Sequence, residues 1–246
     1  RRYYVPMTRA LFLTLLLCAT PPAQAALDLV SWGALLGPAV SDGQVDYRQW
    51  RDNPSFDALV EQVATTDITG MSREEVLVFY INAYNILAAR GILDGSAPSS
   101  ILRRYTYFKR DKYTVAGRVI NLDELEHQLI RPLGESRAHF AVVCASQSCP
   151  VLRDEAYTLA KFDQQLDDAA RVFINDTRRN RFETDSNKAE ISRIFDWFEE
   201  DFDADAGSVQ VYLARYIEDQ AIARLLSRQQ FTVHYLDYDW SLNGVK

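Results

Sequence analysis

The chain has 246 residues, of which 48% are hydrophobic and 25% charged, with 10 glycines, 8 prolines and 3 cysteines. This composition is typical of a globular protein and excludes collagen-like, disordered and disulfide-dense classes. The formal net charge of −7 argues against general binding to nucleic acid, because that binding depends on Lys and Arg displacing counterions from phosphates. We therefore expect no nucleic acid among its partners.

The beginning of the chain has the pattern of a secretory signal peptide. Arg9 precedes the apolar run 10–19, and residues 23–25 form a small-x-small cleavage site. The apolar run of about ten residues is too short for a bilayer, which needs about 20, and we find no run of that length later in the chain. We therefore expect a periplasmic or secreted protein without a transmembrane segment.

Removal of the signal peptide defines the expected mature protein. Cleavage after Ala25 leaves a single exported domain at 26–246, and we expect residues 1–6 to lie upstream of the true start at Met7. The mature chain keeps 24 Lys and Arg against 34 Asp and Glu, a net charge of −10. Cys18 leaves with the signal peptide, so two cysteines enter an oxidising compartment, where thiols tend to pair.

The first expected elements of the mature chain are a buried helix and a hairpin. Ser72 and Glu75 form a capping box for a helix over 74–90. This helix is apolar on nearly every face, which places it in the middle of the fold, and Gly91 is expected to end it as a C-cap. Residues 113–120 contain two short β-prone runs about a glycine turn and predict a hairpin.

The rest of the chain adds more helices than strands. Asn121 and Glu124 form a second capping box, for a helix that ends near Pro132. The apolar run 139–144 predicts a buried strand, and 231–235 predicts a last strand. Further helices are expected over 158–174, 192–202 and 208–228. No regular βαβ units occur, so we expect an α+β fold: a single mainly helical domain with a central buried helix and a small, mostly antiparallel sheet.

The segment 139–150 carries the most informative chemistry. The expected strand delivers the chain to a polar turn that contains Cys144 and Cys149. Pro150 suits the first position of a helical turn, with Cys149 at its N-cap. Because a helix N-terminus stabilises a thiolate, this position favours Cys149 as a nucleophile with a lowered pKa.

A nucleophilic thiol also needs a base within hydrogen-bond reach. Only His127, His139 and His234 supply an imidazole. On a regular strand His139 and Cys144 point to opposite faces, so they would not pair directly. The polar turn can fold Cys149 back, which makes Cys149 with His127 or His139 the better pairing.

Three other interpretations of the two cysteines stay open. Two cysteines five positions apart in an exported protein most simply form a disulfide, worth about 2 kcal/mol on a chain-entropy argument. They can also remain inert thiols. Cys144, Cys149, His127 and His139 have the ligand types of a zinc site, although their spacing matches no standard pattern. The acidic run 201–207 mimics only the start of a calcium loop, so we expect no metal and no cofactor.

Two asparagines and a glutamate have open roles. Asn82 and Asn85 lie one turn apart on one face of the buried helix, where an amide must be hydrogen-bonded. They either pin a neighbouring loop or act at a catalytic site, by orienting a histidine or lining an oxyanion site. Glu126 is either a surface residue or a carboxylate that holds His127 near the cysteine turn.

A basic and aromatic stretch stands out in the acidic chain at 103–112. It is either an amphipathic connection with its aromatic side chains inside, or a contact for an anionic partner such as envelope polymer or lipid headgroups. The residues of that anionic contact would be Arg103, Arg104, Tyr107, Lys109 and Arg110.

Four motifs together resemble the family of domains of unknown function numbered 547. They are 79–85, 122–127, 139–150 and 194–198. The resemblance covers about 71–202, with a weaker extension to Trp240, and the cysteine segment is its most specific part. It implies a domain that occurs in exported bacterial proteins and, attached to other modules, in plant proteins, and it implies no particular reaction.

Two functional hypotheses follow, and the sequence does not decide whether the protein is an enzyme. The first is a thiol-dependent hydrolase or acyl transferase that acts on an amide or ester of the cell envelope. Its candidate catalytic residues are Cys149, His139, His127, Asn82, Asn85 and Cys144. The second is a non-catalytic binding or assembly module, which a Cys144–Cys149 disulfide staples and whose basic region contacts an unknown envelope partner.

Overall fold

The computed structural model describes residues 26–246, which form a mainly helical α+β fold with 53% helix and 12% strand. The predicted fold class is confirmed, while the expected signal peptide lies outside the described residues. The α-helices are α1 (Leu29–Ala39), α2 (Pro54–Thr65), α3 (Arg73–Leu93), α4 (Ile101–Tyr105), α5 (Leu122–Glu124), α6 (Phe162–Ile174), α7 (Ile194–Trp197), α8 (Glu199–Ala206), α9 (Val209–Ala214) and α10 (Gln220–Ser227).

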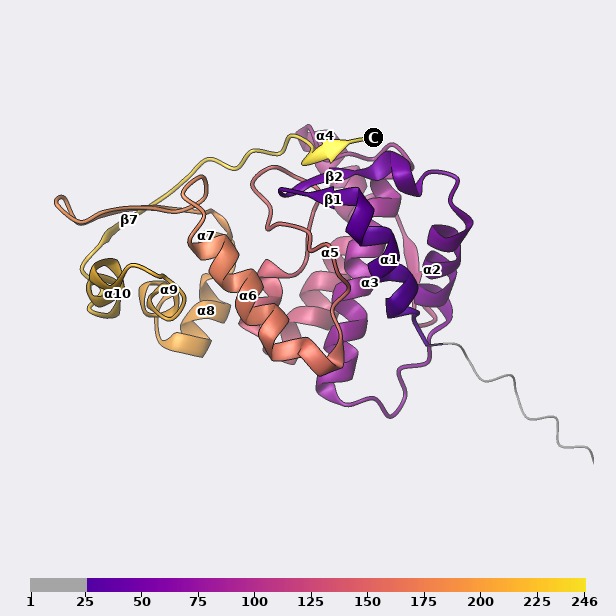
Figure 1. Cartoon of the computed structure of the whole chain (residues 1–246), viewed down its shortest axis with the longest axis horizontal. Helices are drawn as coiled ribbons and strands as arrows, with labels where there is room; N and C mark the ends of the chain where they lie inside the picture. The colour runs from indigo at the N-terminus through magenta and orange to yellow at the C-terminus, as the bar shows by residue number, and fades with distance from the viewer. Residues whose placement is uncertain (1–25) are drawn as a thin grey trace, which may run out of the picture.

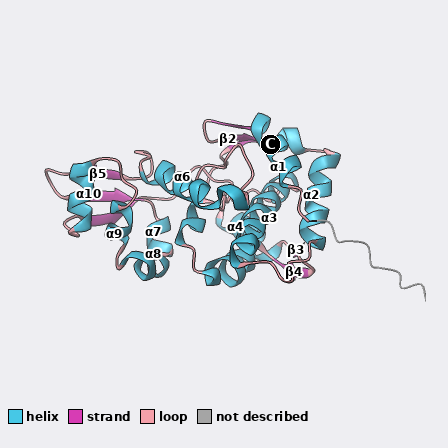
Figure 2. Ribbon diagram, turned by 60° about the horizontal axis from the view of Figure 1, so that its bottom comes forward, coloured by secondary structure: helices cyan, strands magenta, loops and turns pink. Residues whose placement is uncertain are grey.

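Three small sheets accompany the helices, rather than the one sheet expected. They have the strand orders β1-β2-β8, β3-β4 and β5-β6-β7, and in Figure 2 they lie apart from one another among the helices. The predicted hairpin at 113–120 is confirmed as the antiparallel pair of β3 and β4. The strands are β1 (Val40–Ser41), β2 (Gln44–Asp46), β3 (Tyr113–Val115), β4 (Arg118–Ile120), β5 (Arg181–Glu183), β6 (Lys188–Ile191), β7 (Thr232–Tyr235) and β8 (Gly244–Val245).

Helix α3 is the central buried element that the sequence predicts. Its capping box is present, since Glu75 N donates to Ser72 Oγ at 3.2 Å and Ser72 N donates to Glu75 Oε2 at 2.7 Å. The expected C-cap at Gly91 is wrong, because the helix continues through it. A Cβ at Gly91 would lie 2.8 Å from side-chain atoms of Tyr107 and Tyr113, so this glycine permits close packing and does not end the helix.

The length and composition of α3 also satisfy the criteria for a membrane-spanning helix, and no other described helix does so. However, 83% of its most apolar window is buried inside the fold, as is typical of the core helix of a globular protein.

Two adjoining apolar cores organise the fold. The first surrounds α3 and includes Trp50, whose ring stacks on Phe56 with centroids 5.7 Å apart. The second lies around α6, α8 and α9, where the rings of Phe140 and Phe173 are 5.1 Å apart. Figure 1 shows α8 and α9 towards one end of an elongated molecule, α6 in the middle and α3 on the other side, with the last segment of the chain running back from β7 to β8 beside β2.

The predicted buried strand at 139–144 is wrong. Ser136–Phe140 forms a short 3-10 helix, and an irregular loop follows it. The loop satisfies its buried polar backbone groups through a side chain, because Asn85 donates to Ala141 O and accepts from Val143 N, both at 2.9 Å. The apolar composition of this run therefore reflects burial and not sheet pairing.

The predicted helical turn at Pro150 is also absent, since residues 150–158 contain no helix. Cys149 consequently has no helix N-terminus beside it, and the dipole argument for its reactivity does not apply.

The other predicted helices exist in broken form. The helix expected over 192–202 is divided into α7 and α8, and the one over 208–228 into α9 and α10. The helix over 158–174 begins with the 3-10 turn Leu159–Lys161 and continues as α6. The capping box at Asn121 is present, but α5 passes into the π-helical segment Leu125–Ile130. The expected last strand is confirmed as β7.

Candidate functional site

The cysteine loop 144–149 is held by residues from distant parts of the chain. Arg179 Nη2 donates to Gln147 O at 2.9 Å and to Cys149 O at 2.6 Å. On another side, Gln147 N donates to Ser241 O at 2.8 Å, in the segment that returns towards β2. Both sets of contacts fix the loop and bring the C-terminal segment to its side.

Asn82 and Asn85 pin the backbone near this loop. Asn82 donates to Tyr157 O at 2.9 Å and accepts from Tyr157 N at 3.1 Å. Asn85 holds the two residues on either side of Val142, as described above. Both amide side chains are thus hydrogen-bonded to backbone groups. Neither of them lines the cavity beside the cysteines, which is described below.

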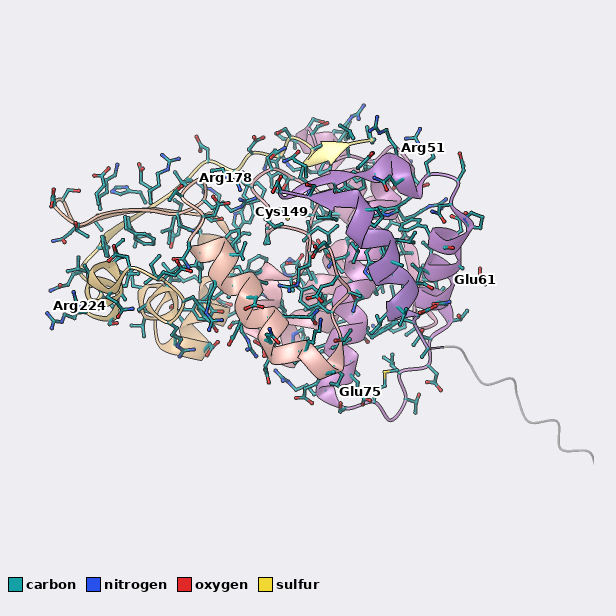
Figure 3. The ribbon with its side chains drawn as sticks, viewed as in Figure 1. Arg51, Glu61, Glu75, Cys149, Arg178 and Arg224 are labelled. Atoms are coloured by element: carbon teal, nitrogen blue, oxygen red, sulfur yellow. The ribbon has the colours of Figure 1, made fainter. Side chains whose placement is uncertain are left out.

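The two thiols are in direct contact. Their Sγ atoms lie 2.7 Å apart, which is longer than a covalent S–S bond of about 2.05 Å, and both cysteines are buried free thiols. Cys149 donates to Cys144 Sγ, which also lies 3.1 Å from Ser146 Oγ and 3.4 Å from Tyr238 OH. Figure 3 places Cys149 in the middle of the molecule.

These contacts separate the pKa values of the two thiols. At Cys144 burial opposes ionisation, but hydrogen bonds from Cys149, Ser146 and Tyr238 outweigh it and lower the pKa to about 7. At Cys149 burial and the neighbouring charge of Cys144 raise the pKa well above its ordinary value. The contacts therefore favour Cys144, rather than Cys149, as the thiolate of the pair.

A cavity of about 170 Å³ opens beside the thiols. It brings together four of the six candidate residues from the sequence, and its lining also includes the carboxylates of Asp123 and Glu126. The four candidates are Cys144, Cys149, His127 and His139. Trp197, Tyr238 and Trp240 give it an aromatic wall, with the rings of Tyr238 and Trp240 4.5 Å apart.

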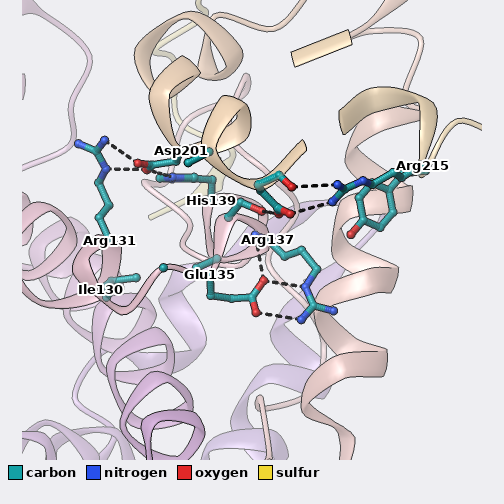
Figure 4. Close-up of a pocket in the computed structure, with 13 residues that line it drawn as sticks. Ile130, Arg131, Glu135, Arg137, His139, Asp201 and Arg215 are labelled. Carbon is teal, nitrogen blue, oxygen red and sulfur yellow. Dashed lines mark hydrogen bonds and ion pairs between the residues drawn. The ribbon is translucent and has the colours of Figure 1, made fainter. Parts of the chain in front are cut away.

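His139 is oriented by a carboxylate, as Figure 4 shows. Its Nε2 lies 2.7 Å from Asp201 Oδ2, and Asp201 also accepts two hydrogen bonds from Arg131, at 2.8 and 3.0 Å. The His139 ring stacks on Phe198 with centroids 3.9 Å apart. These contacts fix both the position and the plane of the imidazole.

The charges of this pair define the tautomer of the histidine. Burial opposes ionisation of Asp201, but the hydrogen bonds from His139 and Arg131 hold its pKa well below the usual range. Burial lowers the pKa of His139 more than Asp201 raises it, so the ring is neutral near pH 7. Nε2 must then carry the proton and donate it to Asp201, which leaves Nδ1 as a basic nitrogen. Within 26–246, Nδ1 makes no hydrogen bond.

Glu126 adds a protonatable group to the same cavity. Burial, and then the charge of Cys144, raise its pKa to about 7, while Tyr84 OH donates to its Oε2 at 3.3 Å. Near neutral pH the carboxyl group therefore carries a proton in a large fraction of molecules.

The other histidines are less suited to act as the base. His127 is half-exposed, and its Nδ1 lies 2.9 Å from Arg131 Nη1, which occupies that nitrogen. His234 pairs with Glu190 in the β6–β7 ladder and does not line the cavity. Among the described residues, we find no group of three or more His, Cys, Asp or Glu side chains that could hold a metal ion.

A second cavity, of about 520 Å³, lies on the other side of His139 (Figure 4). Its three arginines are all paired with carboxylates: Arg131 with Asp201, Arg137 with Glu135, and Arg215 with Asp205. These pairs leave no free cationic group for an anionic ligand.

Sequence reasoning missed Asp201 and Tyr238 as members of the site. Asp201 is 62 positions from His139, and Tyr238 is 94 positions from Cys144. No local spacing joins residues so far apart. The acidic run 201–207 is the one local signal near Asp201, and from the sequence we assigned it no role in the site.

The fold and cavity define a mainly helical α+β protein with a buried pair of contacting thiols. Residues 68–174 match the protein family described as "Protein of unknown function, DUF547", which confirms the resemblance seen in the motifs. The matched segment includes α3 and the cysteine loop. Comparison with curated proteins and with solved structures found no match.

Proposed function

We propose that this protein is an exported thiol-dependent hydrolase or acyl transferase, which acts on an amide or ester of the cell envelope. The observation that carries the proposal is the shared cavity of Cys144, His139 and Glu126. It combines a thiol whose pKa is lowered to about 7 with an imidazole held by Asp201. A nucleophile, a base and a group that orients the base are the three parts of thiol acyl-transfer chemistry.

In the first step the Cys144 thiolate attacks the carbonyl carbon of the substrate. A C–S bond forms, and the carbonyl π electrons move to the oxygen. Collapse of this intermediate breaks the bond to the amine or alkoxide and leaves a thioester on Cys144. The leaving group takes its proton from Glu126, whose raised pKa keeps a proton available near pH 7.

In the second step water or an acceptor hydroxyl attacks the thioester. His139 Nδ1 accepts the proton of the attacking group while Asp201 stabilises the imidazolium. The C–S bond breaks and returns the Cys144 thiolate, which Tyr238 and Ser146 stabilise by donating hydrogen bonds. The imidazolium proton then returns to Glu126 through solvent, which completes the cycle.

The contact of the two sulfur atoms supports the alternative, a binding or assembly module stapled by a disulfide. The two Sγ atoms lie 2.7 Å apart, so an oxidant would find both partners of a Cys144–Cys149 disulfide already in contact. A disulfide would consume the thiolate, so the two functions make opposite predictions for a native preparation.

The test is the capture of an acyl-enzyme. The chain is incubated with a panel of p-nitrophenyl acyl esters, and its intact mass is then measured. We expect one acyl adduct, which maps to Cys144, is lost in Cys144→Ser and persists in Cys149→Ser. His139→Ala should accumulate the adduct, since it removes the base of the second step.

The matched control is His234→Ala, which removes an imidazole outside the cavity and should behave as the unmodified chain. An adduct that forms equally in Cys144→Ser would refute the role of this thiol. A native chain that reacts only after reduction would instead favour the stapled module.

A further inference from the structure

Helix α4 exposes three large apolar side chains in a single turn. The exposed fractions are 79% for Ile101, 75% for Leu102 and 59% for Tyr105. The other large exposed apolar residues of the described chain are scattered singly along its sequence. Such an exposed apolar cluster indicates a surface that contacts something outside the molecule.

Positive charge surrounds this cluster in an otherwise acidic chain. Arg103 and Arg110 are exposed and make no ion pair within 26–246. The Arg104 guanidinium lies 4.7 Å from the centre of the Trp240 ring. Lys109 and Lys112 are neutralised by Asp123 and Glu124, at 3.3 and 2.7 Å, so the arginines carry the free charge.

We infer that α4 and the residues after it dock the protein on the surface of an anionic phospholipid bilayer. Apolar side chains that enter the headgroup boundary, flanked by arginines that bind lipid phosphates, are the features of an interfacial anchor. The whole chain has a net charge of −7 even with this basic segment included, so the rest of the molecule has no electrostatic attraction to such a surface. We therefore assign the contact of α4 to a lipid surface, and not to an apolar groove of another protein.

One residue of the expected anionic contact does not belong to this surface. Tyr107 is fully buried and donates to Ala88 O at 3.0 Å. The exposed aromatic side chain of the segment is Tyr105, whose ring suits the bilayer interface.

The docking surface adjoins the cavity of the thiols. Phe108 lines that cavity and packs on Trp240, another lining residue, with ring centroids 6.0 Å apart. Arg104 covers the same Trp240 ring. Docking through α4 would therefore hold the cavity close to lipid. The docking itself involves no catalytic step, so this inference does not depend on the proposed reaction.

The test is co-sedimentation of the chain from Ala26 to Lys246, which contains every described element, with two kinds of vesicle. One contains phosphatidylglycerol and phosphatidylethanolamine, and the other only phosphatidylcholine. We expect binding to the first, weakened by added salt, and at least about tenfold weaker binding to the second. The double variant Ile101→Asn/Leu102→Asn should bind at least about tenfold more weakly.

Charge and apolar surface each have a matched control. Arg103→Gln/Arg110→Gln should weaken binding by more than about tenfold, at about fivefold for each arginine. Arg224→Gln/Arg228→Gln removes two arginines at and just after the end of α10, and Figure 3 shows Arg224 at the far end of the molecule. Leu159→Asn/Val172→Asn removes two exposed apolar side chains elsewhere. Both controls should bind as the parent chain does.

Three results would overturn the inference. The first is no sedimentation with phosphatidylglycerol vesicles. The second is equal weakening by the α4 variants and their controls. The third is a dimer in solution that the Ile101/Leu102 variant dissociates, which would assign the surface to a second copy of the chain. Thermal unfolding of each variant verifies that the substitutions leave the fold intact, as expected for exposed positions.

Discussion

Replacement of Asn85 by Ala tests how the fold positions the candidate nucleophile. Asn85 is 3% exposed, and its amide satisfies Ala141 O and Val143 N, which directly precede Cys144 in the loop. The substitution leaves two buried backbone groups without partners, at about 1–3 kcal/mol each. We therefore expect Asn85→Ala to lower the free energy of unfolding by about 2–6 kcal/mol.

The measurement is urea unfolding followed by tryptophan fluorescence, with Gln128→Ala as the control. Gln128 is exposed and makes no side-chain hydrogen bond within the described part of the chain, so its replacement should change stability by less than about 0.5 kcal/mol. Loosening of the loop should also speed alkylation of the cysteines by iodoacetamide. A loss of less than about 1 kcal/mol with unchanged alkylation would refute the idea that this amide holds the loop.

Three further substitutions probe the charges of the site. Because the folded state raises the pKa of Glu126 from 4.5 to about 7, its stabilising effect is complete below pH 4.5 and is lost as the pH rises through 7. Urea titrations should therefore show that the free energy of unfolding of Glu126→Gln rises by about 2 kcal/mol relative to that of the parent chain between pH 5 and 8, because each pKa unit is worth about 1.4 kcal/mol. A difference between the two chains that does not change with pH would contradict this. Asp201→Asn should cost about 2–4 kcal/mol at pH 7, since Arg131 and His139 lose the negative charge and one of the two acceptor oxygens that they share. Because the pKa of Asp201 is depressed, that cost should shrink in thermal unfolding as the pH falls below about 4. Tyr238→Phe removes a donor to Cys144 and should shift the pH midpoint of its alkylation upwards; an unshifted midpoint would exclude this contact.

The sequence correctly predicted the elements that are determined by residues close together in the chain. The capping boxes at Ser72 and Asn121 and the hairpin at 113–120 depend on residues only a few positions apart, and all three are present. The buried helix was equally visible, because its apolar residues cover every face.

The cysteine loop could not be predicted in the same way. Its apolar run is buried like a strand, but its backbone is satisfied by Asn85, 58 positions earlier than Val143, and by the C-terminal segment. The contacts that set the ionisation of Cys144 likewise include Tyr238, 94 positions later. Residue types identified the thiols and His139 as candidates, while the partners that define their chemistry are placed by tertiary packing.

The central claim is that Cys144 is a free thiolate near neutral pH, and alkylation of each cysteine as a function of pH tests it most directly. The native protein, purified without reductant, is treated with iodoacetamide, and peptide mass spectrometry follows Cys144 and Cys149 separately. We predict that Cys144 reacts first, with a midpoint near pH 7, and that Cys149 reacts only at much higher pH. Protection of both thiols until a reductant is added, or earlier reaction of Cys149, would contradict the claim.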